Sequence, residues 1–248
     1  MEMQKPRRPV SLLASVTDES EARLCASLGA DIIDAKNPAA GALGVLPAER
    51  VRAIRAAVPA HVPVSATIGD PCDDPDRVVQ AVRLTAASGV NFVKIGFWPA
   101  SGAGSPIGEL GRLSLKNARL VAVLLADRGI DLKLLEPLAD AGFAGVMLDT
   151  FDKRSGALPD IASPASLRDF VGAAHATGLF AGLAGSLRLE NVPLLLSLGA
   201  DVLGFRGGLC VGAARTATID PAAVRAVRRA CGPALRGAIA PLQTERAL

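Results

Sequence analysis

Short apolar runs alternate along the chain with amphipathic stretches of about a dozen residues. Such alternation is typical of repeated βα units, in which a buried strand is followed by a helix that covers it. Eight apolar runs are the expected strands: 10–14, 32–35, 64–68, 92–95, 120–125, 145–149, 179–183 and 202–205. The pattern therefore predicts an α/β fold in which eight parallel strands close into a TIM (β/α)₈ barrel.

Four glycines place the even-numbered strands in a common register. Gly29, Gly89, Gly142 and Gly199 each precede one of these strands, as expected of glycines that end helices. The residues five positions after them are Asp34, Lys94, Met147 and Gly204. The residues seven positions after them are Lys36, Gly96, Asp149 and Arg206. Because side chains two apart on a strand share a face, both sets are predicted to point inward at the carboxyl ends of the strands, where barrel enzymes have their active sites.

Two lysines and two aspartates at this rim suggest chemistry on carbonyl groups. A lysine that is partly desolvated beside other cations has a lowered pKa and can attack a carbonyl carbon to form an imine, and both Lys36 and Lys94 fit this description. Asp34 shares a face with Lys36, so it can move protons during imine formation. Asp149 and Lys153 add a second carboxylate and a third amine. Ion pairs at strand ends are the alternative explanation for each residue taken singly.

The segments that follow the seventh and eighth strands are rich in glycine. They are Gly182-Leu183-Ala184-Gly185-Ser186 and Gly204-Phe205-Arg206-Gly207-Gly208. Barrels frequently bind phosphate in these two loops, where glycines let backbone N–H groups approach an anion. The candidate phosphate-binding residues are Gly182, Gly185, Ser186, Arg206, Gly207 and Gly208. Ordinary turns that need a positive φ are the alternative.

The composition fits one barrel domain over residues 1–248, with a short lead at 1–8 and a tail at 232–248. Half of the 248 residues are hydrophobic but only 3% are aromatic, so aliphatic side chains must fill the core. The scarcity of aromatic rings argues against stacking on nucleic acid bases. The net charge of +3 is spread along the chain, which leaves small anionic molecules as the expected partners.

Cysteine and histidine contribute no recognisable site. The four cysteines, Cys25, Cys72, Cys210 and Cys231, form neither CxxC pairs nor a metal-ligand pattern with His61 and His175, so reduced thiols and no metal are expected. Proton transfer then falls to lysine and aspartate. The charged start and the lack of a long apolar segment predict a cytoplasmic protein that makes no membrane contact. Leu and Val on the outer helices favour a symmetric homo-oligomer.

Several segments together resemble the (5-formylfuran-3-yl)methyl phosphate synthase family. They are 31–38 with 41–44, 93–96, 145–150 with Lys153, and 182–186, and the similarity extends from about Val10 to about Cys231. The resemblance implies a carbon–oxygen lyase acting on phosphates, which condenses two molecules of glyceraldehyde 3-phosphate into 4-(hydroxymethyl)-2-furancarboxaldehyde phosphate without a cofactor. The product begins the furan of methanofuran-type cofactors, and the Ala- and Arg-rich composition suggests a one-carbon-oxidising bacterium.

The resemblance also assigns the site residues. It implies that Lys36 forms the Schiff base, that Asp34 is its paired acid, and that Lys94, Asp149 and Lys153 complete the active site. Two other functions fit the same residues. A class I aldolase would use the same barrel and the same imine on another phosphorylated aldehyde. A barrel without activity could instead bind a phosphorylated metabolite.

Overall fold

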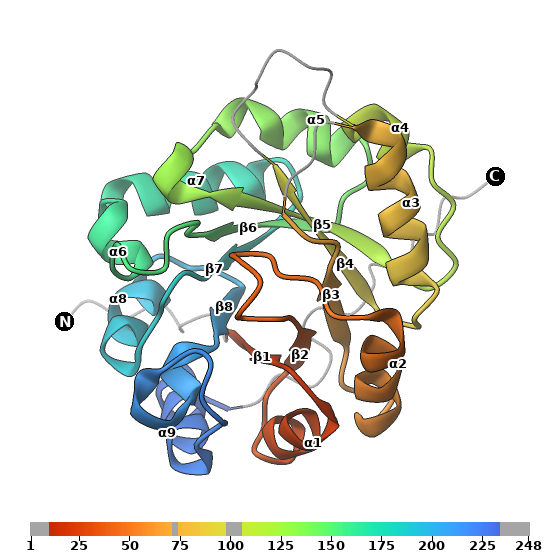
Figure 1. Cartoon of the computed structure of the whole chain (residues 1–248). Helices are drawn as coiled ribbons and strands as arrows, with labels where there is room; N and C mark the ends of the chain where they lie inside the picture. Colours follow the sequence, from red (N-terminus) through yellow and green to blue (C-terminus); the bar gives the residue numbers. More distant parts are fainter. Residues whose placement is uncertain (1–9, 71–73, 98–105, 234–248) are drawn as a thin grey trace.

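The computed structural model describes residues 10–70, 74–97 and 106–233. Eight parallel strands form a closed barrel in sequence order, and helices surround it (Figure 1). The strands are β1 Ser11–Val16, β2 Ile32–Ala35, β3 Val64–Thr67, β4 Phe92–Phe97, β5 Arg119–Leu125, β6 Gly145–Asp149, β7 Phe180–Leu183 and β8 Val202–Phe205. The predicted TIM barrel is confirmed. The expected bounds of β2, β6 and β8 match, and the other strands differ by one or two residues at an end.

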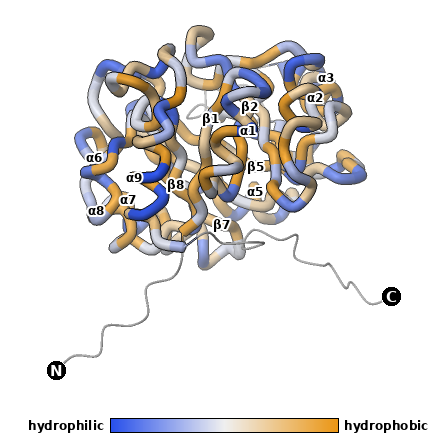
Figure 2. Tube along the Cα trace, turned by 90° about the horizontal axis from the view of Figure 1, so that it is seen from below, coloured by the Kyte–Doolittle hydropathy of each residue, from blue (hydrophilic) through white to orange (hydrophobic). Residues whose placement is uncertain are grey.

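The outer layer consists of α-helices and short 3₁₀ turns. The α-helices are α1 Glu19–Ser27, α2 Ala48–Ala57, α3 Pro75–Ala86, α4 Ile107–Gly111, α5 Leu135–Asp140, α6 Leu158–Ile161, α7 Pro164–Ala176, α8 Val192–Ser197 and α9 Pro221–Cys231. The 3₁₀ turns are η1 Ala126–Arg128, η2 Leu132–Leu134, η3 Leu189–Asn191, η4 Gly207–Leu209 and η5 Val211–Ala213. Hydrophobic and hydrophilic residues alternate along these helices, as expected when one helix face is buried (Figure 2). In the described ranges no helix is long and apolar enough to cross a membrane.

Side chains at helix starts and glycines at helix ends set the lengths of the helices. The carboxylate of Asp18 accepts hydrogen bonds from the N–H groups of Ser20 and Glu21 and so caps α1, while Ser163 caps α7. The four glycines that precede the even-numbered strands all have positive φ, from +76° to +91°. This left-handed conformation favours glycine, so the predicted helix ends are confirmed.

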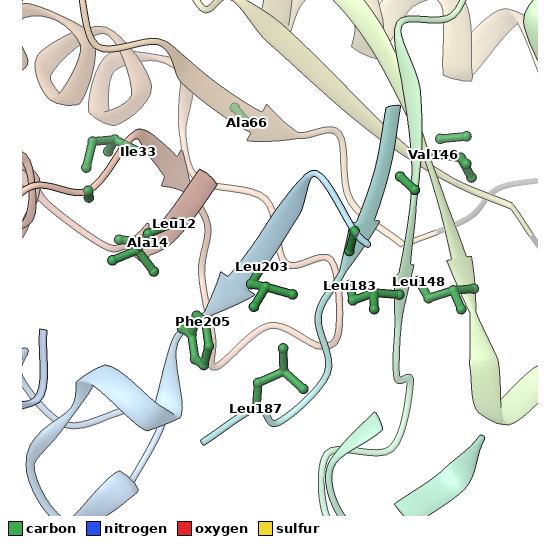
Figure 3. Packing of buried hydrophobic residues seen from close by; sticks show 14 of the residues in the cluster. Leu12, Ala14, Ile33, Ala66, Val146, Leu148, Leu183, Leu187, Leu203 and Phe205 are labelled. Carbon is green, nitrogen blue, oxygen red and sulfur yellow. The ribbon is translucent and has the colours of Figure 1, made fainter. Parts of the chain in front are cut away.

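Alternate residues of each strand face two different layers. One layer lies between the strands and the helices and includes Leu12, Leu183 and Leu203, which Figure 3 shows on neighbouring strands. The other layer fills the barrel interior below the carboxyl ends of the strands, which we call the upper end. It includes Leu13, Ile32, Phe92, Val121, Val123, Met147 and Val202. Because aliphatic and aromatic side chains fill the middle of the barrel interior, the charged residues Asp34, Lys94 and Asp149 lie toward the carboxyl ends of the strands.

Truncation of Phe170 tests the layer between strands and helices. Phe170 lies on α7 and is fully buried, so Phe170→Ala should lower the free energy of unfolding by about 3–5 kcal/mol. Leu84 lies on α3 and is 61% exposed, so Leu84→Ala should cost less than about 0.5 kcal/mol. Equilibrium denaturation in urea measures both values. Equal losses in the two variants would contradict the packing of α7 against the barrel.

Candidate active site

A cavity of about 190 Å³ opens at the carboxyl ends of the strands. Inward-facing residues of β4 and β6 line it together with residues just beyond β2 and the loops that follow β6, β7 and β8. Lys36, Lys94, Asp149 and Lys153 all contribute to its wall, while Asp34 lies behind Lys94 and is fully buried. The predicted catalytic residues are therefore brought together at one place.

The two sets of inward-facing residues form two levels of ion pairs. In the lower set, a carboxylate oxygen of Asp34 lies 2.7 Å from Nζ of Lys94. In the upper set, Nζ of Lys36 lies 3.2 Å from a carboxylate oxygen of Asp149. Each pair joins different strands at the same level of the barrel. The prediction from the glycine register, that both sets point inward, is thus confirmed for these four residues.

The pairing of Asp34 differs from the expected one. Asp34 and Lys36 share a face of β2, yet the carboxylate of Asp34 bonds to Lys94 and to the hydroxyls of Ser15, at 2.8 Å, and Ser65, at 2.7 Å. Residues two apart on a strand stand roughly 6.6 Å apart along it, so their side chains reach partners across the barrel more easily than each other. Asp34 is therefore the partner of Lys94 rather than of Lys36.

Burial and charge act against each other in the lower pair. Burial alone would raise the pKa of Asp34, but the ammonium groups of Lys94 and Lys36 outweigh it and hold the pKa below its ordinary range. Burial lowers the pKa of Lys94, and Asp34 offsets part of that change. Three hydrogen bonds to the Asp34 carboxylate hold this pair in place beneath the cavity.

The upper group contains two amines and one carboxylate. Nζ of Lys153 contacts the carboxylate of Asp149 and the carbonyl oxygen of Thr150, and the N–H of Thr150 donates to Asp149 at 2.8 Å. Burial would raise the pKa of Asp149, but Lys153 and Lys36 together hold it far below its ordinary range. Burial lowers the pKa of Lys153. The Asp149 carboxylate is thus the nearest proton acceptor for an amine that attacks a carbonyl group.

The loop after β2 shapes the wall beside Lys36. The N–H of Asn37 donates to the carbonyl oxygen of Gly44 at 2.9 Å, and the Thr67 hydroxyl donates to Leu43 at 2.9 Å. A Cβ atom on Gly44 would lie 2.1 Å from the carbonyl oxygen of Asn37, a distance that excludes any side chain. Glycine at position 44 therefore lets the loop close tightly next to the amine.

The loops after β7 and β8 present free backbone donors to the cavity. Gly185, Ser186, Gly207 and Gly208 line it, and within the part of the chain that the structure describes their N–H groups have no hydrogen-bond acceptor. Gly185 has a φ of +109°, which a residue with a side chain rarely adopts. These four predicted phosphate-binding residues are placed where backbone amides can meet an anion.

Two other predicted phosphate-binding residues have different surroundings. Gly182 is not among the described residues that line the cavity. A Cβ atom there would lie 2.6 Å from Met147, so the glycine makes room for that side chain. The guanidinium of Arg206 lines the cavity but bonds to the carboxylate of Glu21 and to the carbonyl oxygens of Ser15, Arg215 and Ala217. These bonds engage all five of its N–H donors, which leaves none for a phosphate.

Several residues of the site were missed by the sequence reasoning. Ser15 and Ser65 could have been found, because each is a hydroxyl at an inward position of a largely apolar strand. Arg188 and Arg215 also line the cavity, but they lie in loops without periodicity, where the sequence carries no signal of direction. Glu21 lies on α1, far from Arg206 in the sequence, so its ion pair with Arg206 depends on the fold.

The described histidines and cysteines do not line the cavity. Nε2 of His175 lies 2.7 Å from a carboxylate oxygen of Asp201, and His61 is exposed. Cys25, Cys210 and Cys231 are buried free thiols, and burial raises the pKa of Cys25 to about 12, while Cys72 lies outside the described residues. No group of three or more His, Cys, Asp or Glu side chains suited to a metal ion occurs in the ranges that the structure describes.

Asp149 should make the stability of the barrel sensitive to acid. Its pKa in the folded protein is below the ordinary value of 3.8, so the unfolded chain takes up this proton more readily than the folded one. The stabilisation is complete above that value and is lost as the pH falls toward the folded pKa. Between about pH 5 and about pH 3, the free energy of unfolding in urea should therefore fall more steeply for the parent protein than for Asp149→Asn.

The exposed Asp169 on α7 provides the control for this measurement. Asp169→Asn should keep the steep pH dependence of the parent protein, because the carboxylate of Asp149 is intact. If Asp149→Asn lost stability with acid as steeply as the parent protein does, the Asp149 carboxylate would not be held in its charged form by the two lysines.

Comparisons with known proteins agree with this arrangement. The family model described as 4-HFC-P synthase matches residues 12–228. A (5-formylfuran-3-yl)methyl phosphate synthase of Methanocaldococcus jannaschii is 35% identical over 234 residues, which cover 89% of this chain and 99% of that protein. A relative in Methylorubrum extorquens, provisionally given the same name, is 39% identical over 213 residues, 86% of this chain and 88% of the other.

Solved structures agree in fold alone. Phosphoribosyl anthranilate isomerase of Thermus thermophilus superimposes with a TM-score of 0.62 at 18% identity, over 89% of this chain and 98% of the isomerase. At this identity the likeness extends to the barrel and not to its chemistry. The family match and the relatives extend over the strands and loops that build the cavity, and the chain belongs to the 4-HFC-P synthase family.

Proposed function

We propose that this protein is a (5-formylfuran-3-yl)methyl phosphate synthase, which condenses two molecules of glyceraldehyde 3-phosphate through an imine on Lys36. The observation that carries the proposal is a nearly buried amine that lines the cavity 3.2 Å from the Asp149 carboxylate, in a chain of the 4-HFC-P synthase family. The family membership supports a synthase. The substrate, the imine and the supply of a furan to methanofuran-type cofactors are parts of the proposal.

The proposed reaction begins when the amine of Lys36 attacks the carbonyl carbon of one triose phosphate. Loss of water gives an imine, and loss of a proton from the adjacent carbon gives an enamine. The enamine carbon then forms a bond to the aldehyde carbon of the second triose phosphate. A hydroxyl of the second triose attacks the imine carbon to close the ring and expels the Lys36 amine, and the net loss of phosphate and a second water makes the ring an aromatic furan. The protonated imine is itself the electron sink, so the proposal requires neither a metal nor an organic cofactor.

Asp149 is the residue best placed to move protons at Lys36. Its carboxylate accepts from the ammonium at 3.2 Å and can return the proton to the hydroxyl that leaves as water. Lys153 contacts the same carboxylate and can stabilise negative charge that develops beside it. The Asp34–Lys94 pair lies one level below, where Lys94 also lines the cavity and can hold a substrate oxygen.

The free amides of the β7 and β8 loops are proposed to bind a substrate phosphate. Gly185, Ser186, Gly207 and Gly208 line the same cavity as the amine, and in the described residues their N–H groups have no hydrogen-bond acceptor. A phosphate anchored there would hold the carbonyl carbon near Lys36 and so favour attack. A cytoplasmic location and a symmetric homo-oligomer remain predictions.

Reductive trapping tests the identity of the amine. Borohydride added with glyceraldehyde 3-phosphate should reduce the imine and add mass at Lys36, as measured by peptide mass spectrometry. Lys36→Ala should lower turnover by roughly a thousandfold or more. Lys36→Arg should lose turnover to a similar extent, because a guanidinium does not form this imine. Lys133→Arg, at an exposed position, is the matched control and should keep full activity. Trapping at another lysine would overturn the assignment.

The product separates a synthase from the two alternatives. The pure protein mixed with glyceraldehyde 3-phosphate alone should generate a furan aldehyde, which absorbs in the near ultraviolet and has a distinct mass. A class I aldolase would trap an imine but form no furan chromophore. A barrel that only binds phosphate would form neither, and it would tolerate Lys36→Arg. Absence of the chromophore at any enzyme concentration would therefore overturn the proposed function.

A further inference from the structure

Two arginines in different loops flank the glycine pair that follows β8. A Cβ atom built on Gly207 would lie 3.7 Å from Cβ of Arg215, and one built on Gly208 would lie 3.3 Å from Cα of Arg188. Both arginines and both glycines line the cavity. The arginines come from the loop after β7 and from the loop after η5, so it is the fold that brings both next to the same glycine pair.

Neither arginine has a carboxylate partner among the residues that the structure describes. Nη2 of Arg215 donates to the carbonyl oxygen of Gly41 at 3.0 Å, which leaves its other donors unbonded in the described part of the chain. The exposed guanidinium of Arg188 has no hydrogen-bond acceptor in the same ranges. Two arginines that line one cavity beside glycine amides are suited to an anionic ligand.

The balance of charges around the cavity also favours an anionic ligand. Lys94 is balanced by Asp34, Arg206 is balanced by Glu21, and Lys36 and Lys153 share Asp149. In the described residues no carboxylate lies within ion-pair distance of Arg188 or Arg215, and Asp149, which attracts Arg215 from farther away, already pairs with two lysines. A phosphate monoester carries a charge of about −1.5 to −2 at neutral pH, which two guanidinium groups would balance.

Arg206 fixes the position of one member of the pair. Its Nε donates to the carbonyl oxygen of Arg215 at 2.8 Å, and one Nη donates to Ala217 at 2.9 Å, while Glu21 holds the guanidinium from the other side. The buried ion pair therefore holds the backbone that carries Arg215 against the cavity. Arg206 acts as a positioning residue, and Arg215 is the cation that can contact a ligand.

We propose that Arg188 and Arg215 form a guanidinium clamp which, together with the amides of Gly207 and Gly208, binds the phosphate monoester of a substrate. That the phosphate belongs to a substrate rests on the proposed function. A guanidinium stays charged and forms no imine with an aldehyde, so the clamp holds the phosphate without competing with the lysines for the carbonyl group. Anchoring and chemistry are thus assigned to different residue types.

Binding of glycerol 3-phosphate tests the clamp apart from catalysis, because this ester has no carbonyl group and forms no imine. Calorimetry should show that Arg188→Gln and Arg215→Gln each weaken its binding by roughly tenfold to a hundredfold, as expected for loss of a charge-assisted hydrogen bond. Arg215→Lys keeps the positive charge but lacks the paired N–H donors of a guanidinium, so its affinity for glycerol 3-phosphate should lie between those of Arg215→Gln and the parent protein. Glycerol, which lacks the phosphate, should not bind measurably.

Arg154 is the matched control, since it lies on the loop beside Lys153, its side chain is 91% exposed and it does not line the cavity. Arg154→Gln should bind glycerol 3-phosphate like the parent protein. Unchanged affinity in Arg188→Gln and Arg215→Gln, or no binding by the parent protein, would overturn the clamp. Thermal melting curves show whether each variant is folded. If Arg215→Gln unfolds, Arg188→Gln still tests the clamp, because Arg188 is exposed and its replacement should leave the fold intact.

Trapping with unphosphorylated glyceraldehyde separates this inference from the proposed function. The variants Arg188→Gln and Arg215→Gln should still form an imine at Lys36 with this aldehyde, because the clamp does not act on the carbonyl group. A protein that loses ester binding in both variants but never traps at Lys36 would keep the clamp and refute the imine. Trapping at Lys36 together with unchanged binding of the ester in both variants would support the imine and refute the clamp.

Discussion

The cost of burying charge governs the upper half of this barrel. Moving an ion from water into a protein interior costs several kcal/mol, and the cost is recovered only when a partner and further hydrogen bonds replace the lost water. Asp34, Lys36, Lys94 and Asp149 are all nearly or fully buried, and each lies within ion-pair distance of an opposite charge. In the described residues no buried side-chain nitrogen or oxygen atom lacks a hydrogen-bond partner. The positions of these charges are therefore mutually dependent.

The ion pairs of the barrel differ in the further contacts of their members. The Asp34–Lys94 pair and the Glu21–Arg206 pair are each completed by further hydrogen bonds, from serine hydroxyls in the first case and to backbone carbonyls in the second. Groups held in this way are fixed in place. Lys36 and Lys153 share the Asp149 carboxylate next to the cavity, and this carboxylate also accepts from the N–H of Thr150. An incoming carbonyl or phosphate oxygen can take up part of the contact of either lysine, so the chemistry is proposed where two amines share one negative charge.

The sequence predicted the positions of the strands and the direction of their side chains more accurately than the partners of those side chains. The spacing of four glycines placed Asp34, Lys36, Lys94 and Asp149 inward, because a strand has a fixed period of two and a barrel a fixed inside. The shared strand face of Asp34 and Lys36 and the family resemblance paired these two residues, although the structure pairs Asp34 with Lys94. Arg206 was also placed correctly at the rim, yet its donors are engaged by Glu21 and by backbone carbonyls. The glycine register placed the two members of each ion pair in the same set, but periodicity along a strand does not show which side chains of a set come within ion-pair distance.

The chain by itself thus determined the closed barrel, the inward face of each strand and the glycine-rich loops at its carboxyl end. These features follow from periodicity and from backbone conformations that act over a few residues. Only the tertiary structure decided which amine shares a carboxylate with which neighbour, that Glu21 pairs with Arg206, and that Arg215 lies next to Gly207 and Arg188 next to Gly208. Those relations join residues far apart in sequence, and they depend on how closure of the barrel brings separate strands and loops together.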